Sequence, residues 1–276
     1  SIKPKNGTFV SDFDKSQIKN RLKNYAIAGI NSEIVDLKIL YVEIDSTVYY
    51  NPSQISSASN LRTRIIGGLN DYAHNVELNK FGGRFKYSKA STLIDRIDNG
   101  ITSNITKVII RRDLKALLNQ FAQYELCFGN KFNINPAGYN IKSTGFTISG
   151  FTEVAYITDV PNKNASGGLD GSNLGTLSVV SKNNRNQQRV IVKEAGIVDY
   201  KKGEVILNTI NITSTVNQNN IIEIQAFPES NDVVGLKDLY LSFDVSKSTI
   251  NTIKDVIASG EDVSGVVFTR DYYTSS

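Results

Sequence analysis

The stretch IVDLKILYVEIDSTVYYNP, residues 34–52, is rich in β-branched and aromatic residues and ends at a proline, which is typical of a β-strand. Its apolar residues alternate at first, then resume one residue out of step, at Val35, Leu37 and Ile39 and then at Val42, Ile44 and Val48. A two-residue period that changes face predicts either a β-bulge or a strand centre that is buried on both sides.

The residues after this strand have the period of a helix. From about residue 58 to 78 apolar residues recur at steps of three and four, at Leu61, Ile65, Leu69, Tyr72 and Val76. A serine among residues 56–59 can cap the helix. Gly67 and Gly68 lie inside it, and each costs about 1 kcal/mol relative to alanine. Such a cost predicts that another backbone packs closely against the helix.

The next stretch, KFGGRFKYSKASTLIDRI at residues 80–97, has a glycine pair between basic residues and allows two interpretations. A phosphate loop needs a strand before its glycines and Lys-Ser/Thr after them, but here a helix precedes and Arg84 follows. We therefore interpret Gly82–Gly83 as a structural turn. A second helix is predicted to begin at Ser88 as its cap and to end at Asn99–Gly100, with an apolar face of Ala90, Leu93, Ile94 and Ile97.

SNITKVIIRR, residues 103–112, supplies another strand. The order strand, helix, helix, strand predicts an α+β fold in which two helices cover one face of a sheet. Leu114, Leu117, Leu118 and Phe121 fit a helix, but 121–128 alternate like a strand, so we predict a strand there and leave 113–120 open. A further amphipathic helix, capped near Ser11 or Asp14, is predicted over 11–28.

From residue 129 onward short alternating runs are separated by Gly, Asn and Pro, which predicts a mostly antiparallel β-rich region. VDYKKGEV, residues 198–205, has the composition of a hairpin turn. STINTIKDVIASG, residues 248–260, is predicted to form a short late helix on the spacing of Ile250, Ile253 and Ile257. We expect three parts: an N-terminal helix and connector at 1–30, an α+β domain at 31–128 and a β-rich domain at 129–276.

Composition limits the chemistry. The chain has 276 residues, one His, one Cys, no Met and a net charge of +4. The absent Met suggests a piece of a longer protein. Zinc sites, Ser-His-Asp triads and Cys-His pairs all draw on histidine, so the common hydrolytic sites lack their parts. We expect no nucleic-acid partner because no basic run occurs, and no membrane partner because no apolar run is long enough.

The remaining candidate residues are better explained by structure than by catalysis. His74 lies off the apolar stripe of its helix, and Cys127 lies in an apolar strand that predicts a buried thiol. PNKNASGGLDGSN, residues 161–173, resembles the start of a calcium loop but has Asn where a bidentate Glu belongs. The pairs Asp95/Asp98 and Glu261/Asp262 fit charged helix ends, and Arg111–Arg112 could contact an acidic partner. We therefore predict no enzyme activity and no catalytic, cofactor-binding or metal-binding residue.

The order of these parts resembles that of J-like baseplate proteins from contractile-tailed phages, over roughly residues 30–245. The resemblance rests on VEIDSTVYYNP, LRTRIIGGLNDYA, FGGRFKYSKASTLIDRI and NITKVIIRR, and on the later AGIVDYKKGEVIL and IIEIQAFPESNDVVGLKDLYLSFD, which are similar to the large wedge subunit of that class. It implies a structural protein of the virion tail baseplate, made in the host cytoplasm and without cofactors.

The resemblance further implies that such subunits form a ring around the tail hub, rearrange on contraction and bind other wedge subunits. We expect self-association as a homodimer, because tyrosines such as Tyr49–Tyr50 and Tyr272–Tyr273 are enriched in interface cores. Two alternatives belong to other classes: a carbohydrate- or receptor-binding tail module, and an enzyme that uses carboxylates alone. A glycan array tests the first, and activity screens with Asp and Glu substitutions test the second.

Overall fold

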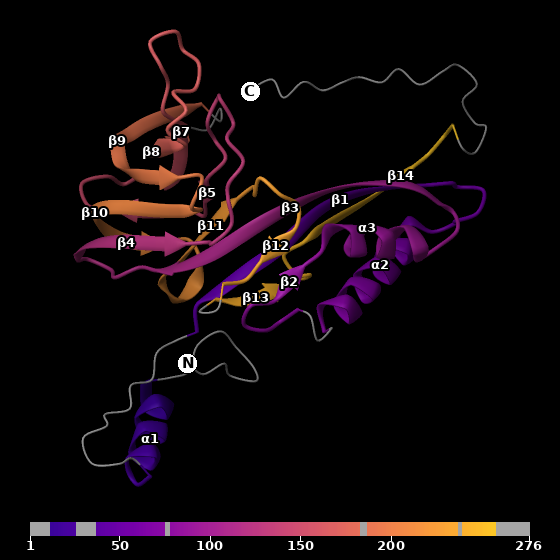
Figure 1. The fold of residues 1–276 in the computed structure, drawn as a ribbon, viewed down its shortest axis with the longest axis horizontal. Coiled ribbons are helices and arrows are strands. Elements are labelled where there is room, and N and C mark those ends of the chain that lie inside the picture. Colours follow the sequence, from indigo (N-terminus) through magenta and orange to yellow (C-terminus); the bar gives the residue numbers. More distant parts are fainter. Residues whose placement is uncertain (1–11, 26–36, 75–77, 183–186, 237–238, 258–276) are drawn as a thin grey trace.

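The computed structural model describes all residues except 1–11, 26–36, 75–77, 183–186, 237–238 and 258–276 (Figure 1). The helices of the described part are α1 (Asp12–Lys23), α2 (Ala58–Ala73) and α3 (Tyr87–Arg96), with a 3₁₀ turn at Gln218–Asn220. The strands are β1 (Ile39–Tyr50), β2 (Arg84–Phe85), β3 (Ile101–Lys115), β4 (Phe121–Cys127), β5 (Lys142–Ser143), β6 (Phe146–Ile148), β7 (Ala155–Pro161), β8 (Leu174–Lys182), β9 (Gln188–Asp199), β10 (Glu204–Thr215), β11 (Ile221–Ala226), β12 (Val233–Val234), β13 (Tyr240–Phe243) and β14 (Thr249–Lys254). The fold is α+β and mostly strand.

β1 is the strand on which the sheet is built. It pairs antiparallel with β3 along nearly its whole length, and the register shifts between Tyr49 and Tyr50. Val42, Glu43 and Ile44 are consecutive and all buried, so the strand centre is covered on both sides. Of the two alternatives raised by the change of apolar phase, the strand centre that is buried on both sides is the one observed there, and the register shift lies at the far end of the strand.

Helices α2 and α3 lie on one side of β1, β3 and β14 (Figure 1). The apolar stripe of α2 is buried as its spacing predicts, at Leu61, Ile65, Leu69 and Tyr72. Ser57 is the N-cap and accepts a hydrogen bond from Asn60 N–H, so the predicted serine cap is confirmed. The helix ends at Ala73, earlier than predicted. No helix among the residues described is both long and apolar enough to cross a membrane.

The start of α3 corrects the sequence prediction. Lys86 occupies the N-cap position and makes no side-chain cap, and Ser88 lies within the helix. The Tyr87 N–H instead donates to the Asp232 carboxylate at 2.9 Å, across 145 positions of sequence. A carboxylate at a helix N-terminus is favourable because it satisfies an orphan donor and complements the helix dipole. The cap comes from a distant segment, which local pattern cannot reveal.

The glycine pair before α3 forms a turn, in agreement with our interpretation. Gly82 has φ +61°, in the left-handed region that glycine adopts without strain. Gly83 lies outside that region and is buried, with its carbonyl accepting from Gly235 N–H at 2.8 Å. The two glycines therefore serve different purposes: one makes the turn and the other lies against a neighbouring backbone.

The late helix predicted at 248–260 is wrong for its described part. Residues Thr249–Lys254 form β14, which runs parallel to β1 from Asp45 to Tyr50. β13 pairs with β1 in the same parallel sense just before it. The isoleucine spacing fitted a helix, but the β-branched residues Thr249, Ile250, Thr252 and Ile253 favour a strand once β1 offers a partner.

The rest of the sheet is antiparallel and follows the order β3-β11-β5-β7-β6-β10-β9-β8. An additional pairing of β7 with β8 closes five strands on themselves, at the left of Figure 1. The predicted hairpin at 198–205 is confirmed: β9 and β10 pair, and Gly203 has φ +70°. The predicted strand at 121–128 is β4, and part of the ambiguous 113–120 continues β3 to Lys115.

The two glycines inside α2 should respond differently to alanine. A Cβ at Gly67 would meet nothing within 4 Å, whereas one at Gly68 would lie 2.7 Å from Ile97 Cδ1 and 3.1 Å from Leu93 Cδ2. α3 side chains, and not a backbone as expected, approach Gly68. We expect Gly67→Ala to raise the free energy of unfolding by roughly 0.5–1 kcal/mol. The free energy of unfolding of Gly68→Ala should be about 1 kcal/mol lower than that of Gly67→Ala, because the added methyl group crowds Ile97 and Leu93. Urea unfolding of both variants checks this, and equal effects would contradict it.

Candidate functional site: a buried arginine among four carboxylates

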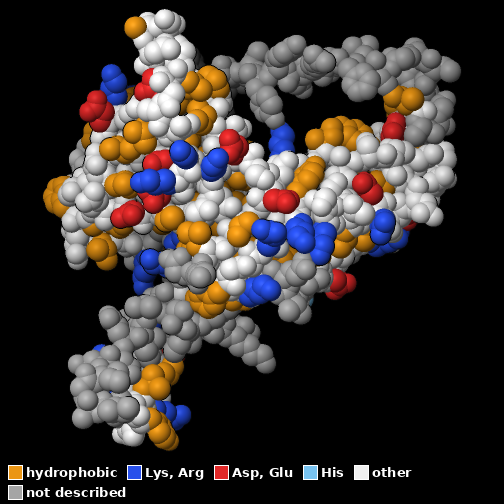
Figure 2. Space-filling view, in the orientation of Figure 1, with side chains coloured by type: hydrophobic (Ala, Val, Ile, Leu, Met, Phe, Trp, Pro, Cys, Tyr) orange, Lys and Arg blue, Asp and Glu red, His pale blue; other side chains and the backbone are white. Residues whose placement is uncertain are grey.

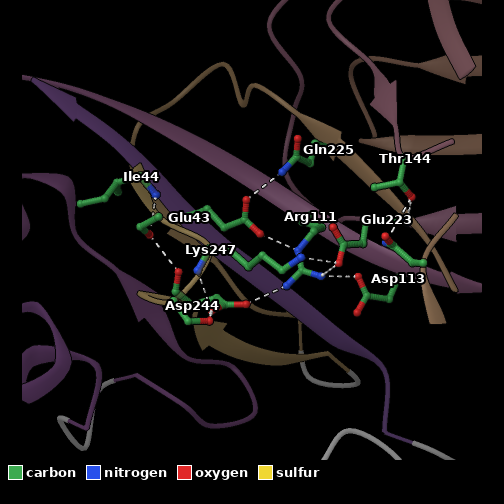
Figure 3. Close-up of polar contacts among 12 residues, drawn as sticks. Glu43, Ile44, Arg111, Asp113, Thr144, Glu223, Gln225, Asp244 and Lys247 are labelled. Carbon is green, nitrogen blue, oxygen red and sulfur yellow. Dashed lines mark hydrogen bonds and ion pairs between the residues drawn. The ribbon is translucent and has the colours of Figure 1, made fainter. Parts of the chain in front are cut away.

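Arg111 lies in the second half of β3, and its side chain is on the face of the sheet opposite α2 and α3. Tyr41 of β1 and Gln225 of β11 are its register partners on the two neighbouring strands. Because side chains on adjacent strands at matched positions share a face, the groups around Arg111 come from several strands at once. Figure 3 shows these groups converging on the guanidinium.

Four carboxylates surround the guanidinium. Arg111 Nε donates to Glu43 Oε1 at 2.5 Å, Nη1 to Asp113 Oδ1 at 2.6 Å, and Nη2 to Asp244 Oδ2 at 2.8 Å. Glu223 Oε1 lies 3.3 Å from Nη1. The Arg111 side chain is only 4% exposed, and that of Glu43 only 3%. The planar fork of arginine suits this arrangement because it presents several donors in fixed directions.

A second ring of contacts holds the carboxylates in place. Gln225 Nε2 donates to Glu43 Oε2 at 2.8 Å, and Lys247 Nζ donates to Glu223 Oε1 at 2.9 Å. The guanidinium carbon also lies 4.1 Å from the centre of the Tyr41 ring. Figure 3 shows the Gln225 and Lys247 contacts.

Burial and charge shift the pKa values of the cluster in opposite ways. Burial raises the pKa of Glu43 and of Asp113, although the nearby guanidinium works against that rise. Burial alone lowers the pKa of Arg111, but its carboxylate neighbours together raise it, so the arginine stays charged. Burial, together with the negative charge of Asp113, raises the pKa of Tyr41 to about 12.

The cluster ties together four neighbouring parts of the sheet. Its members lie on β1, β3 and β11 and in the segment that joins β13 to β14. It contains no nucleophile paired with a base, and its carboxylates are directed at an arginine. Such an arrangement positions the strands relative to one another. Separating these strands would leave a buried charge without its partner, which costs free energy, so the cluster favours their moving together.

A second buried polar pair lies in the β-rich region. Asp159 of β7 is fully buried, and it accepts hydrogen bonds from Tyr200 Oη and Ile141 N–H, each at 2.6 Å. No ion pair within the described residues involves it. Burial raises the pKa of Asp159, and burial together with Asp159 raises that of Tyr200. This pair joins β7 to the turn after β9.

The structure separates the residues that sequence analysis considered. His74 is exposed at the end of α2, and its Nδ1 lies 2.6 Å from Asn70 O. Asp95 accepts from Asn104 Nδ2 at 2.6 Å, and Asp98 pairs with Arg64 at 2.6 Å. These are contacts at helix ends, as expected. Glu261/Asp262 lie outside the described residues.

The loop at 161–173 is organised by its own side chains. Asn164 Oδ1 accepts from Ser166 and Gly168 N–H, and Asp170 Oδ1 accepts from Ser172 N–H. Within the described ranges no group of three or more His, Cys, Asp or Glu is arranged to hold a metal. Cys127 is half-buried and not buried as predicted.

The proposed contact of Arg111–Arg112 with an acidic partner needs correction. Arg111 is saturated by carboxylates of its own chain, and Arg112 Nη1 donates to Cys127 O at 2.6 Å. Sequence analysis missed the cluster entirely. The available signal was a set of charged residues inside strand-like runs, Glu43, Arg111, Asp113 and Glu223, where the pattern asks for apolar side chains.

Comparison with known proteins connects this part of the fold to a family. Residues 38–113 match the family of "Baseplate structural protein gp6, C-terminal domain III". That range begins before β1 and contains α2, α3 and β3 as far as Asp113, including three members of the arginine cluster. "Baseplate wedge protein gp6" of Enterobacteria phage T4 is 26% identical over 117 residues, which are 42% of this chain.

The matched segment covers 17% of the length of the T4 protein, so this chain corresponds to a small part of it. The family match falls on the strand-helix-helix-strand segment from which the resemblance was first drawn, and the relative carries the wedge name. Over residues 38–113 the chain is thus similar to the C-terminal domain III of a baseplate structural protein, and its partly matching relative is a baseplate wedge protein.

Proposed function

We propose that this chain is a structural component of the baseplate wedge of a contractile phage tail, linking subunits into a ring around the tail hub and rearranging on contraction. The observation that carries the proposal is the family match of residues 38–113, because that family is a baseplate structural protein. The chain acts through protein–protein contacts with other baseplate subunits, without an enzymatic reaction.

The arginine cluster supports a role for the matched segment as a rigid part of the subunit. It joins Glu43, Arg111 and Asp113, which lie within residues 38–113, to β11 and to the β13–β14 connection, which lie outside that range. A subunit of a ring that changes shape needs parts that move as rigid bodies. The cluster supplies such rigidity across strands that are far apart in sequence.

Crosslinking of intact tails tests the proposal. Lysine-reactive crosslinkers, followed by mass spectrometry, should join Lys107 or Lys254 of this chain to other baseplate subunits. The pattern of crosslinks should change between extended and contracted tails if the subunit rearranges. Tails in which every crosslink of this chain leads to fibre proteins would contradict a wedge role and favour a receptor-binding module.

Self-association is expected as part of this function. The net charge of +4 over 276 residues gives little long-range repulsion between copies. Of the tyrosines named for this contact, Tyr50 is buried in the chain's own core, at 4% exposed, and Tyr272–Tyr273 lie outside the described residues. We expect a homodimer that persists at high salt, since apolar contacts are not screened. Sedimentation equilibrium at micromolar protein in low and high salt measures this. A monomer of 30.4 kDa under both conditions would contradict it.

A further inference from the structure

β14 is an edge strand within the described part of the chain. It pairs with β1 on one side, and no described strand lies on its other side. Its sequence, TINTIK, has no proline and a single charge at its end. Natural sheets usually protect such edges with prolines, charges or covering segments, because the unpaired backbone is a template for another strand.

The backbone directions in β14 show which residues face this edge. The Asp255 N–H, one residue past the strand, donates to Tyr50 O at 2.8 Å. Backbone groups alternate direction along a strand, so every second residue before Asp255 also faces β1. Ile250, Thr252 and Lys254 therefore direct their N–H and C=O groups away from β1. Ile250 is itself buried, at 2% exposed, so the part of this edge that a further strand can reach is that of Thr252 and Lys254.

On the face of the sheet next to this edge, the described residues include exposed hydrophobic side chains. Ile253 of β14 is 45% exposed and Ile105 of β3 is 58% exposed, on the side opposite the helices. Tyr49 is the register partner of Ile253 and lies half-buried beside it. Figure 2 shows hydrophobic side chains on this side of the long strands. A strand added to β14 would cover Ile253 on one face.

A segment with strand-forming composition follows β14 in the chain. Asp255 Oδ1 accepts from Ile257 N–H at 3.2 Å, so the chain turns as it leaves the strand. The residues beyond, VSGVVFTRDYY at 263–273, are rich in β-branched and aromatic types and contain no proline. At about 3.3 Å per residue, residues 258–262 span at most about 16 Å, and residues 263–273 exceed the length of the six-residue strand β14.

We propose that residues 263–273 of one copy add a strand to the open edge of β14 in a second copy, which makes β14 the subunit-linking edge of the dimer. This inference rests on the proposed self-association and specifies its contact. Two-fold symmetry permits both copies to donate and accept at once, which closes the contact. Backbone pairing supplies the affinity, and the exposed side chain of Ile253 supplies an apolar contact for one face of the added strand.

The decisive variants sit at one position. Lys254→Pro removes an outward N–H while leaving the ladder with β1 intact, and proline is tolerated at such edge positions. Lys254→Ala removes the same side chain but keeps the N–H, so it is the matched control. We expect Lys254→Pro to raise the dimer dissociation constant about tenfold or more, with Lys254→Ala close to wild type. Sedimentation equilibrium of the full chain, with circular dichroism to confirm folding, measures both.

A mixing experiment separates exchange between copies from pairing within one copy. A donor-deficient chain carries Val267→Pro and Thr269→Pro, and its control carries alanine at both positions. Each proline chain alone should be monomeric, but the mixture of Lys254→Pro with the donor-deficient chain should form heterodimers, because one good edge and one good segment remain. Absence of heterodimers would overturn the proposal and point to a hairpin within one chain.

Different results would contradict the contact at β14 and the homodimer itself. If Lys254→Pro remains as dimeric as wild type, the edge inference is wrong while self-association stands. If the wild-type chain is itself monomeric, the proposed homodimer is wrong and the edge has no second copy to bind.

Discussion

Replacing Arg111 by Met is expected to lower the free energy of unfolding by about 3–5 kcal/mol, the cost of breaking a buried ion pair by removing one partner. The side chains have similar length, so lost packing contributes little. What remains is the buried carboxylate of Glu43 beside the partly buried Asp113, Glu223 and Asp244. Among the described residues, Lys247 still pairs with Glu223. Urea unfolding monitored by circular dichroism measures the loss.

The chain offers a matched control for this variant. Arg64 pairs with Asp98 at 2.6 Å, but its side chain is 49% exposed. Arg64→Met should cost no more than about 1 kcal/mol, because solvent screens exposed pairs. If Arg111→Met does not fold, Arg111→Lys keeps the charge and should recover a folded but less stable chain. If Arg111→Met lowers the free energy of unfolding by as little as Arg64→Met does, the cluster does not hold the strands together.

Tyr200→Phe is the second substitution with a large expected effect. It removes the hydroxyl that donates to Asp159 Oδ2 at 2.6 Å and leaves a fully buried carboxylate with fewer donors. Hydrogen bonds to charged groups contribute about 1.5–3 kcal/mol, and we expect a loss in the upper part of that range at pH 7.

The pH dependence of this loss follows from the direction of the Asp159 shift. Burial raises the pKa of Asp159 in the folded protein. The stability that Asp159 contributes is therefore fully present below its pKa in the unfolded chain, about 3.9. It is lost as the pH rises through its higher pKa in the folded protein. Tyr200→Phe removes a group that lowers this pKa, so stability should fall more steeply above pH 4 in the variant than in wild type.

Thermal unfolding at pH 4 and pH 7 checks this dependence by comparing variants, since groups common to all chains cancel. Asp159→Asn carries no charge there and should flatten the difference between the two pH values. A Tyr200→Phe loss of equal size at both pH values would contradict the assignment of Asp159 as the titrating group.

Local pattern was sufficient for the helices and the first strands. The stripe from Leu61 to Tyr72 and the alternating burial along β1 follow from side-chain direction, which is set by neighbouring residues in the chain. The hairpin with Gly203 is likewise local. Structural features that need contacts between residues far apart in sequence could not be predicted from local pattern.

Three features show this dependence. β14 has an ambiguous pattern, and its partner β1 decides that it is a strand. The cap of α3 comes from Asp232. The arginine cluster needs β1, β3, β11 and the segment after β13 side by side before its charges meet. The division into 1–30, 31–128 and 129–276 stays a prediction.

A cryo-electron microscopy reconstruction of the tail baseplate from the phage that encodes this chain tests the central claim most directly. We predict that β1, α2, α3 and β3 fit density repeated around the tail hub, with each copy touching neighbouring wedge subunits. Density for this fold only at the outer ends of fibres, or its absence from the baseplate, would contradict a structural role in the wedge.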